Sequence, residues 1–287
     1  MSPTLHITSG DCAGGILEKS GIAGEVFVWH DVLYDGPRDP GWPSDSTLVA
    51  RAGFLADFTG GGLSRDGVLA TLRKQYRRLA KAKDGKIVLW FDACLFDMAM
   101  LVHLLTCLRI QGITRVELLC VDAFPGIEPY NGLGQLTPVQ MASAYGRRCP
   151  VTDLQFRHAE LVDLAFATQS MSLLEDLAKQ AKAPLPWVPA AARRWLEEQP
   201  GEDGLGRLER MALTAVRDGC DTPAKVLAKV AAMETPPQFW GDTTLWAKIN
   251  GLATRNPPRL KIVGPTPLLP QWEGQGDLTR FVVNPIE

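Results

Sequence analysis

The sequence predicts an α/β fold: a Rossmann-like parallel sheet in an N-terminal domain, a helical segment, and a C-terminal winged-helix-like module. In the first half, short β-branched or apolar runs alternate with helical patterns, which is typical of βαβ units. After residue 124 the pattern becomes helical. Near the C-terminus, three helical patterns precede two strand patterns, the order of a winged helix. We therefore expect domains over residues 1–150 and 201–287, with a helical connector over 151–200.

Four short runs rich in β-branched or apolar residues predict the parallel strands. These strands are Leu5–Thr8, Glu25–Trp29, Lys86–Phe91 and Arg115–Val121. Helical patterns lie between them, over Ala13–Ser20, Leu48–Phe58, Asp66–Ala82 and Leu95–Ile110. The last of these helices is apolar on nearly every face, so we expect it to be covered on all sides. Residues 30–46 are rich in Pro, Gly and Asp and predict a long loop, which in a compact domain is more often functional than idle.

The rest of the chain is predicted to be mainly helical. The helices expected before residue 201 are Thr137–Tyr145, Thr152–Thr168, Met171–Ala181 and Ala190–Glu198. Because proline disfavours helix in the residue before it, the run APLPWVP at 183–189 predicts a hinge. The elements expected in the C-terminal module are helices Leu205–Asp218, Pro223–Met233 and Thr243–Thr254, then strands Arg259–Val263 and Thr279–Val283.

Composition indicates an ordinary globular protein without a general affinity for anionic partners. The 30 basic and 32 acidic residues leave a net charge of −2, so no global field attracts nucleic acid or a membrane surface. The six cysteines show no metal-ligand spacing, which favours a reducing compartment. The N-terminus lacks a secretory pattern, and the longest apolar stretch, Met98–Leu108, is about half as long as a membrane span. We expect a cytoplasmic protein that does not bind a membrane.

Aspartates follow all four predicted strands, and ligands of an open parallel sheet bind beyond the carboxyl ends of its strands. These aspartates are Asp11, Asp31, Asp92 and Asp122. The candidate catalytic residues are Asp11, His30, Asp31 and Asp92. The candidate ligand-binding residues are Ser9, Gly10, Gly14, Asp35, Arg38, Asp97 and Gln135. Converging carboxylates would either hold a divalent cation or divide into a protonated acid and an ionised base.

The turn after the first strand has a functional and a structural interpretation. Ser9-Gly10-Asp11 is followed by a predicted helix, whose N-terminus favours an anion. Asp11 is equally well explained as a helix cap, and Gly14 as a residue that lets the helix pack closely. Asp97 lies in the first turn of another predicted helix, where the helix dipole favours a carboxylate.

The loop after the second strand also allows two interpretations. His30 suits proton transfer near neutral pH, and Arg38 suits bidentate contact with an anion. Together with Asp31 and Asp35 they predict a set of polar groups beside a pocket mouth, and the alternative is a surface turn. Gln135 belongs to a glycine- and proline-rich loop after the fourth strand, which is long enough to close over a ligand.

Two basic clusters raise the question of nucleic acid. One is a run of seven positive residues over 73–86, which an exposed helical face would explain. The other comprises Lys248, Arg255, Arg259 and Lys261 in the C-terminal module. That module carries ten basic and ten acidic residues, whereas proteins that bind DNA usually present a net positive surface. Nucleic acid is therefore left open as a partner but is not favoured.

Several motifs together resemble an uncharacterised bacterial family catalogued as domain of unknown function 1835, with its associated C-terminal domain of unknown function. The motifs are HITSGD, VWHDVLYDGP, LWFDACLFDMAML, GLGQLTP, GLGRLER and WGDTTLWAKINGLA, and the resemblance covers nearly the whole chain. The matching positions include Gly10, Asp11, Asp31, Gly36, Pro37, Asp92 and Asp97. The resemblance implies no assigned reaction. Similar members usually carry Asn in place of Ser9 and a His-Asp pair in place of Ala93-Cys94, which implies a binding variant if that pair performs the family's chemistry.

The sequence leaves two main functions open and does not decide whether the protein is an enzyme. The first is binding of a small, nucleotide-like or phosphorylated ligand at the carboxyl ends of the sheet, with metal-assisted hydrolytic or transfer chemistry and Mg²⁺ as a candidate ion. The second is a ligand-sensing regulator or adaptor whose C-terminal module binds DNA or a protein partner. A homo-oligomer is also left open, with Leu245, Trp246 and Ile249 packed against a neighbour.

Overall fold

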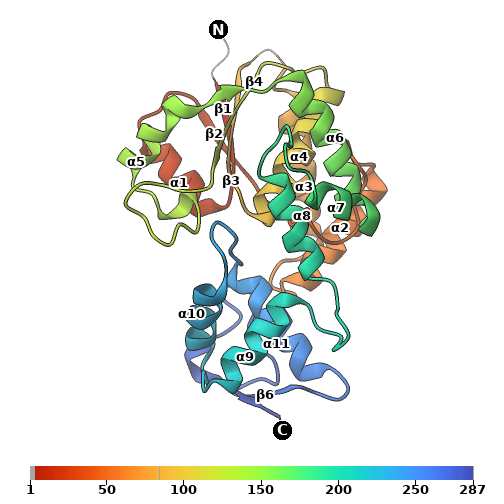
Figure 1. Ribbon diagram of the computed structural model, residues 1–287, viewed down its shortest axis with the longest axis vertical. Coiled ribbons are helices and arrows are strands. Elements are labelled where there is room, and N and C mark those ends of the chain that lie inside the picture. The colour runs from red at the N-terminus through yellow and green to blue at the C-terminus, as the bar shows by residue number, and fades with distance from the viewer. Residues whose placement is uncertain (1–3, 84, 287) are drawn as a thin grey trace. The chain divides into compact units, whose positions relative to one another are not determined.

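The computed structural model describes residues 4–83 and 85–286 (Figure 1). The chain divides into two units. Unit 1 extends to Ala52 and also contains Leu69–Leu196 and Pro236–Gln238. Unit 2 contains Gly53–Val68, Glu197–Thr235 and the chain from Phe239 onward. Most of the expected connector over 151–200 thus belongs to unit 1, and a segment of the N-terminal half belongs to unit 2.

Unit 1 is an α/β unit with a mostly parallel five-stranded sheet. The strands are β1 (Leu5–Ser9), β2 (Glu25–Trp29), β3 (Ile87–Asp92), β4 (Val116–Val121) and β5 (Cys149–Pro150), in the order β2-β1-β3-β4-β5. The first four run parallel, and each lies within one residue of its predicted bounds. The expectation of an all-helical pattern between residue 124 and the C-terminal module is wrong, because β5 pairs antiparallel with β4. With only two residues, β5 has no periodic pattern that could predict it.

Helices cover both faces of this sheet. They are α1 (Asp11–Lys19), α2 (Asp45–Phe58), α3 (Arg65–Ala80), α4 (Leu95–Ile110), α5 (Pro138–Ala144), α6 (Asp153–Ala167), α7 (Met171–Ala178) and α8 (Val188–Glu197). Figure 1 shows α1 and α5 on one side of the strands and α3, α4 and α6 on the other. As its mostly apolar sequence predicts, α4 is enclosed: it lies between β3 and α6, and Met98–Leu108 is buried throughout.

A glycine lets α1 approach the sheet closely. A Cβ atom on Gly14 would lie 2.3 Å from Cγ2 of Val28 in β2, whereas one on Gly15 would meet no atom within 4 Å. Gly14 is buried in α1 and faces the sheet. The structure therefore gives Gly14 a packing role in place of the ligand-binding role expected from the sequence.

The described part of unit 2 contains three complete helices, the end of α2, the start of α3 and a two-stranded antiparallel sheet. The elements are α9 (Arg207–Arg217), α10 (Pro223–Met233), α11 (Asp242–Thr254), β6 (Leu260–Val263) and β7 (Val282–Pro285). Leu208, Trp246, Ile249 and Phe281 lie in their shared core. The last strand begins three residues later than predicted, because Asp277 caps a 3₁₀ turn over Leu278–Arg280.

Contacts from the C-terminal loop explain why residues 53–68 belong to unit 2. The side-chain amide of Gln271 donates to the carbonyl of Phe58 at 2.9 Å, and that of Gln275 donates to the carbonyl of Gly60 at 2.9 Å. Trp272 packs against Gly62, where a Cβ would lie 2.2 Å from the tryptophan Cβ. Among the helices described, none is long and apolar enough to cross a membrane.

Candidate functional site

The sheet has a crossover point between its neighbouring strands β1 and β3. The chain leaves β1 towards β2 and leaves β3 towards β4, on the opposite side of the sheet. In open α/β sheets such a divergence creates a crevice beyond the carboxyl ends, where ligands bind. Ser9 and Gly10 end β1, and Asp92 and Ala93 end β3. We call these residues, with Asp97 and the neighbouring Tyr130, the strand-end site.

Two buried carboxyl groups form the centre of the strand-end site. Asp97, in the first turn of α4, accepts the Ser9 hydroxyl at 2.5 Å and the Asp92 backbone N–H at 2.6 Å. Asp92 accepts the hydroxyl of Tyr130 at 2.6 Å and the backbone N–H of Leu133 at 2.8 Å. Both carboxyl groups therefore use both oxygens, and Ser9 connects the pair to the half-buried end of β1.

Burial shifts the proton affinity of both acids in the same direction. Removal from water, together with the nearby Asp97 charge, raises the pKa of Asp92 to about 8. Burial also raises the pKa of Asp97 to about 6, although the bonds from Ser9 and the Asp92 backbone oppose that rise. Both shifts bring the protonation of these acids close to neutral pH. A protonated acid beside an ionised base is one of the two arrangements that the sequence analysis considered for converging carboxylates, and it stays a prediction.

The first turn of α1 lies beside this pair and is open. Gly10 precedes the helix with a φ of 71°, and no side chain of a described residue caps the helix there. The N–H groups of a helix's first turn lack intrahelical partners and attract anions. His30 approaches this turn from the end of β2, and its Nε2 lies 2.9 Å from Oδ1 of Asp11. The side chains of His30 and Asp11 are 47% and 84% exposed, so the pair is accessible to a ligand.

Two residues of the strand-end region were not expected from the sequence. Tyr130 belongs to the proline-rich loop after β4, where the sequence analysis selected Gln135. Gln135 instead supports that loop: its Oε1 accepts from Asn131 N–H at 2.5 Å and its amide donates to Pro129 O at 3.2 Å. Gln238 accepts the N–H of Leu95 at 2.9 Å and donates to Ala93 O at 3.0 Å. Gln238 thus fixes the turn between Asp92 and Asp97. It lies so far along the chain that no sequence pattern indicated this role.

Three residues of the loop after β2 that were predicted to lie beside a pocket mouth lie elsewhere. Asp31 is 5% exposed and accepts the Nε–H of buried Arg51 at 2.7 Å, so it points inward. Asp35 is exposed and accepts the N–H of its neighbour Gly36 at 2.7 Å, forming the bend that the structural interpretation expected.

Arg38 is buried as well. Its Nη1 donates to Oδ1 of Asp163 at 2.6 Å, and the side chains are 2% and 0% exposed. His103 lies between the same carboxylate and the hydroxyl of Tyr76. Although burial raises it, His103 and Arg38 lower the pKa of Asp163 to about 2. The expectation that Arg38 would stand free at the pocket mouth for an anion is therefore corrected: its charge is neutralised inside the protein.

The four strand-end aspartates consequently do not gather into one recess. Asp92 pairs with Asp97, Asp11 with His30, and Asp31 with Arg51. Asp122 is exposed. Within residues 4–83 and 85–286, no three or more His, Cys, Asp and Glu side chains are arranged to hold a metal ion.

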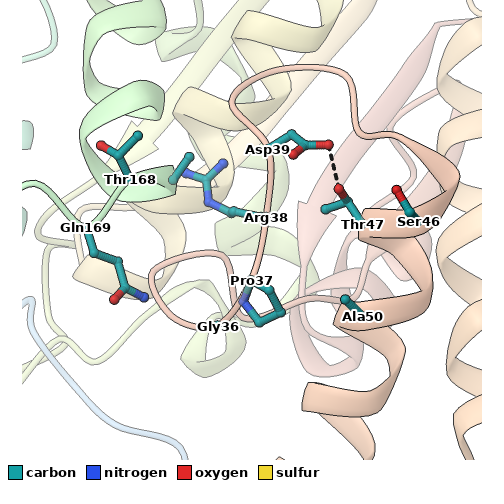
Figure 2. A pocket seen from close by; sticks show the side chains of 10 residues that line it. Gly36, Pro37, Arg38, Asp39, Ser46, Thr47, Ala50, Thr168 and Gln169 are labelled. Carbon is teal, nitrogen blue, oxygen red and sulfur yellow. Dashed lines mark hydrogen bonds between the residues drawn. The ribbon is translucent and has the colours of Figure 1, made fainter.

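A groove of about 650 Å³ lies elsewhere in unit 1 (Figure 2). Its lining comes from the loop after β2, the start of α2 and the end of α6. The lining residues are Gly36, Pro37, Arg38, Asp39, Ser46, Thr47, Ala50, Ala167, Thr168 and Gln169. None of the residues of the strand-end site lines it. The perturbed acids therefore mark the candidate for proton chemistry, whereas this groove is a separate feature.

The fold and this site define an α/β protein with a buried acid pair at the crossover of a parallel sheet. No family model matches the chain, and no curated protein matches it significantly. The functional conclusion therefore depends on the geometry of the site.

Proposed function

We propose that the protein binds a small nucleotide-like or phosphorylated molecule at the carboxyl ends of β1 and β3 and exchanges a proton with it. The Asp92–Asp97 pair carries this proposal. Buried carboxyl groups cost free energy when they ionise, and groups with strongly shifted pKa values concentrate at functional sites. The pair also lies where ligands bind in sheets of this topology.

Ser9 is the group through which the pair would act. Its hydroxyl donates to Oδ1 of Asp97 at 2.5 Å, and Ser9 itself is only partly buried. A proton accepted by the Ser9 oxygen from a ligand can be matched by transfer of the hydroxyl proton to Asp97. Because the pKa of Asp97 is about 6, the carboxyl group is suited to give and take a proton near neutral pH. Asp92, the neighbouring acid, changes the total charge of the pair when it gains or loses its own proton.

The open first turn of α1 supports an anionic group on the ligand. The N–H groups after Gly10 have no capping side chain among the described residues. His30 adds a positive charge beside them when it is protonated. Asp11 opposes an anion unless His30 compensates its charge, which the 2.9 Å contact allows. Phosphate would thus bind the helix end while an uncharged part of the ligand reaches Ser9.

Calorimetry tests this proposal directly. Nucleoside mono- and triphosphates, sugar phosphates and inorganic phosphate are titrated at about pH 7, with and without Mg²⁺, in two buffers of different ionisation enthalpy. The difference between buffers gives the protons exchanged on binding. We expect exchange in the wild type, its loss in Asp97→Asn and Ser9→Ala, and its retention in the exposed control Asp122→Asn. Absence of binding across the panel, or equal exchange in all variants, contradicts the proposal.

Unit 2 supports a second candidate, the ligand-sensing regulator or adaptor. We propose that α9, α10, α11 and the β6–β7 pair form a winged-helix-like module, on the order of three helices followed by an antiparallel pair. Of its basic cluster, Arg255 is engaged by Glu209 at 3.5 Å, while Lys261 is exposed. DNA binding would weaken steeply with salt. Fluorescence anisotropy at two ionic strengths distinguishes DNA from a protein partner.

The resemblance to domain of unknown function 1835 belongs to the same proposal. We infer a relationship from the combined motifs, and from the finding that Asp92, Asp97 and Gly10 of those motifs meet at one end of a sheet. In this interpretation the Ala93-Cys94 turn, which replaces a His-Asp pair, is held by Gln238.

A further inference from the structure

The groove of Figure 2 has the size and mixed lining of a small-molecule site. Its volume of about 650 Å³ falls within the range of about 300–1,000 Å³ that is usual for such sites. Pro37 and Ala50 offer apolar surface, and Asp39, Thr168 and Gln169 offer polar groups. All lining residues belong to unit 1.

Arg38 supplies a hydrogen-bond donor without a free charge. Its Nη1 and Nη2 donate to the side chain and the carbonyl of Asp163, at 2.6 and 3.2 Å. The N–H on Nε has no hydrogen-bond partner among the described residues, although the side chain is only 2% exposed. Leaving a buried donor unpaired costs free energy. A ligand atom that accepts this N–H would remove that cost.

Asp39, the next residue in the same loop, supplies an acceptor. Its Oδ2 accepts the N–H of Ser44 at 3.0 Å and the hydroxyl of Thr47 at 2.6 Å. These two bonds lower the pKa of Asp39, so the group is ionised near neutral pH. Figure 2 shows the bond to Thr47 from one carboxylate oxygen. The other oxygen, Oδ1, makes no hydrogen bond to a described residue and is available to a ligand hydroxyl.

Gln169 completes the set and holds an unusual backbone conformation. Its φ of 47° makes it the single non-glycine residue with positive φ among those described, a conformation that costs free energy outside glycine. Such strain concentrates at functional positions. The Gln169 side chain points towards Gly36 across the groove in Figure 2. Its amide has no hydrogen bond to a described residue and offers both a donor and an acceptor.

The charges of these groups decide the class of ligand. Asp163 neutralises Arg38, and among the described residues no other cation lines the groove. The ionised Asp39 would repel phosphate or carboxylate. A ligand should therefore carry no negative charge, and hydroxyl groups that both donate and accept would match the Arg38 N–H, the Asp39 carboxylate and the Gln169 amide. We propose that the groove binds a neutral polyhydroxylated small molecule of the monosaccharide class, at a place separate from the strand-end site.

Ligand-observed saturation-transfer NMR tests this inference with the full chain. The probes are neutral hexoses, a pentose and inositol, with the corresponding sugar phosphates as a charged comparison. The variants are Gln169→Gly, which keeps the positive φ but removes the amide, and Asp39→Asn, which removes the charge. Asp97→Asn serves as the control for the strand-end site. Thermal unfolding of each variant shows whether it is folded.

We expect at least one neutral polyol to bind, its affinity to fall at least about tenfold in folded Gln169→Gly, and no change in Asp97→Asn. Asp39→Asn should weaken binding of the neutral sugar. It should also reduce the ratio of the affinity for the neutral sugar to the affinity for its phosphate. The inference is overturned if no neutral polyol binds at about 10 mM, if only the phosphates bind, or if Gln169→Gly binds as well as the wild type.

Discussion

Replacing Asp92 by asparagine should make the protein more stable at alkaline pH. The substitution keeps the shape of the side chain and removes its charge. The asparagine oxygen can accept the N–H of Leu133, and its amide can donate to the Tyr130 oxygen once that hydroxyl turns away, so both contacts of 2.8 and 2.6 Å have replacements. The repulsion between Asp92 and Asp97 is lost at the same time.

The expected magnitude follows from the shift in proton affinity. Each tenfold change is worth about 1.4 kcal/mol, and the pKa of Asp92 rises from 3.8 to about 8. Ionisation of Asp92 would thus lower the free energy of unfolding by about 6 kcal/mol at most. Water penetration and relaxation reduce the penalty for a buried ion. We therefore expect the free energy of unfolding of the wild type to fall by about 2–5 kcal/mol when Asp92 ionises, and that of the variant not to show this fall.

The sign and pH range follow from proton counting. Between its unfolded pKa of 3.8 and its folded pKa of about 8, Asp92 binds more protons in the folded state. The free energy of unfolding therefore falls as pH rises through this interval. Burial lowers the pKa of His6 and His158, so their contributions run the opposite way. Their effect cancels when wild type and variant are compared at each pH.

Urea denaturation with hydrogen exchange read on the β3 peptide, Ile87–Asp92, measures unit 1 specifically. The free energy is determined from about pH 4 to pH 9 for wild type, Asp92→Asn and Asp122→Asn. Asp122 is the matched control because it follows the next strand but is exposed. Parallel pH curves for wild type and Asp92→Asn, or a variant that is less stable throughout, would refute the reasoning.

Two further predictions concern packing and the loop after β2. Arg51→Met should destabilise the protein by about 3–5 kcal/mol in urea denaturation, because it leaves Asp31 charged and buried. Adding Asp31→Asn to this variant should recover part of the lost stability. If it recovers none, the broken ion pair is not the cause. Gly14→Ala should cost about 1–3 kcal/mol through its clash with Val28, whereas Gly15→Ala, in open space on the same helix, should gain about 0.5–1 kcal/mol. Equal thermal shifts for the two alanine variants would contradict this assignment.

Long periodic patterns explain why much of the fold could be predicted. The apolar runs of α4 and β3 have a single favourable environment, the middle of the sheet and the helix behind it. The boundary between the two units, by contrast, is not encoded in a local sequence pattern. Residues 53–68 belong to unit 2 through contacts such as Gln271 with Phe58, which are 213 positions apart in the chain. No local pattern encodes a contact of that kind.

The candidate site shows the same limit at the level of single side chains. The strand-end rule located Asp92, and the helix start located Asp97, because both depend on sequence neighbours. Their partners do not: Tyr130 and Leu133 come from a later loop, and Gln238 reaches the turn from 143 positions away. Which carboxyl group is buried decides its pKa, and burial depends on such distant segments.

The loop after β2 connects the two proposed sites physically. It begins at His30, beside the open turn of α1, and residues 36–39 line the groove. Between them, Arg51 donates to the carbonyls of Asp35 and Pro37, both at 3.1 Å, and also to Val32 and Asp31. One buried guanidinium thus fixes both ends of the loop to α2. Because the same side chain holds both parts of the loop, loss of Arg51 should disturb His30 and the groove together.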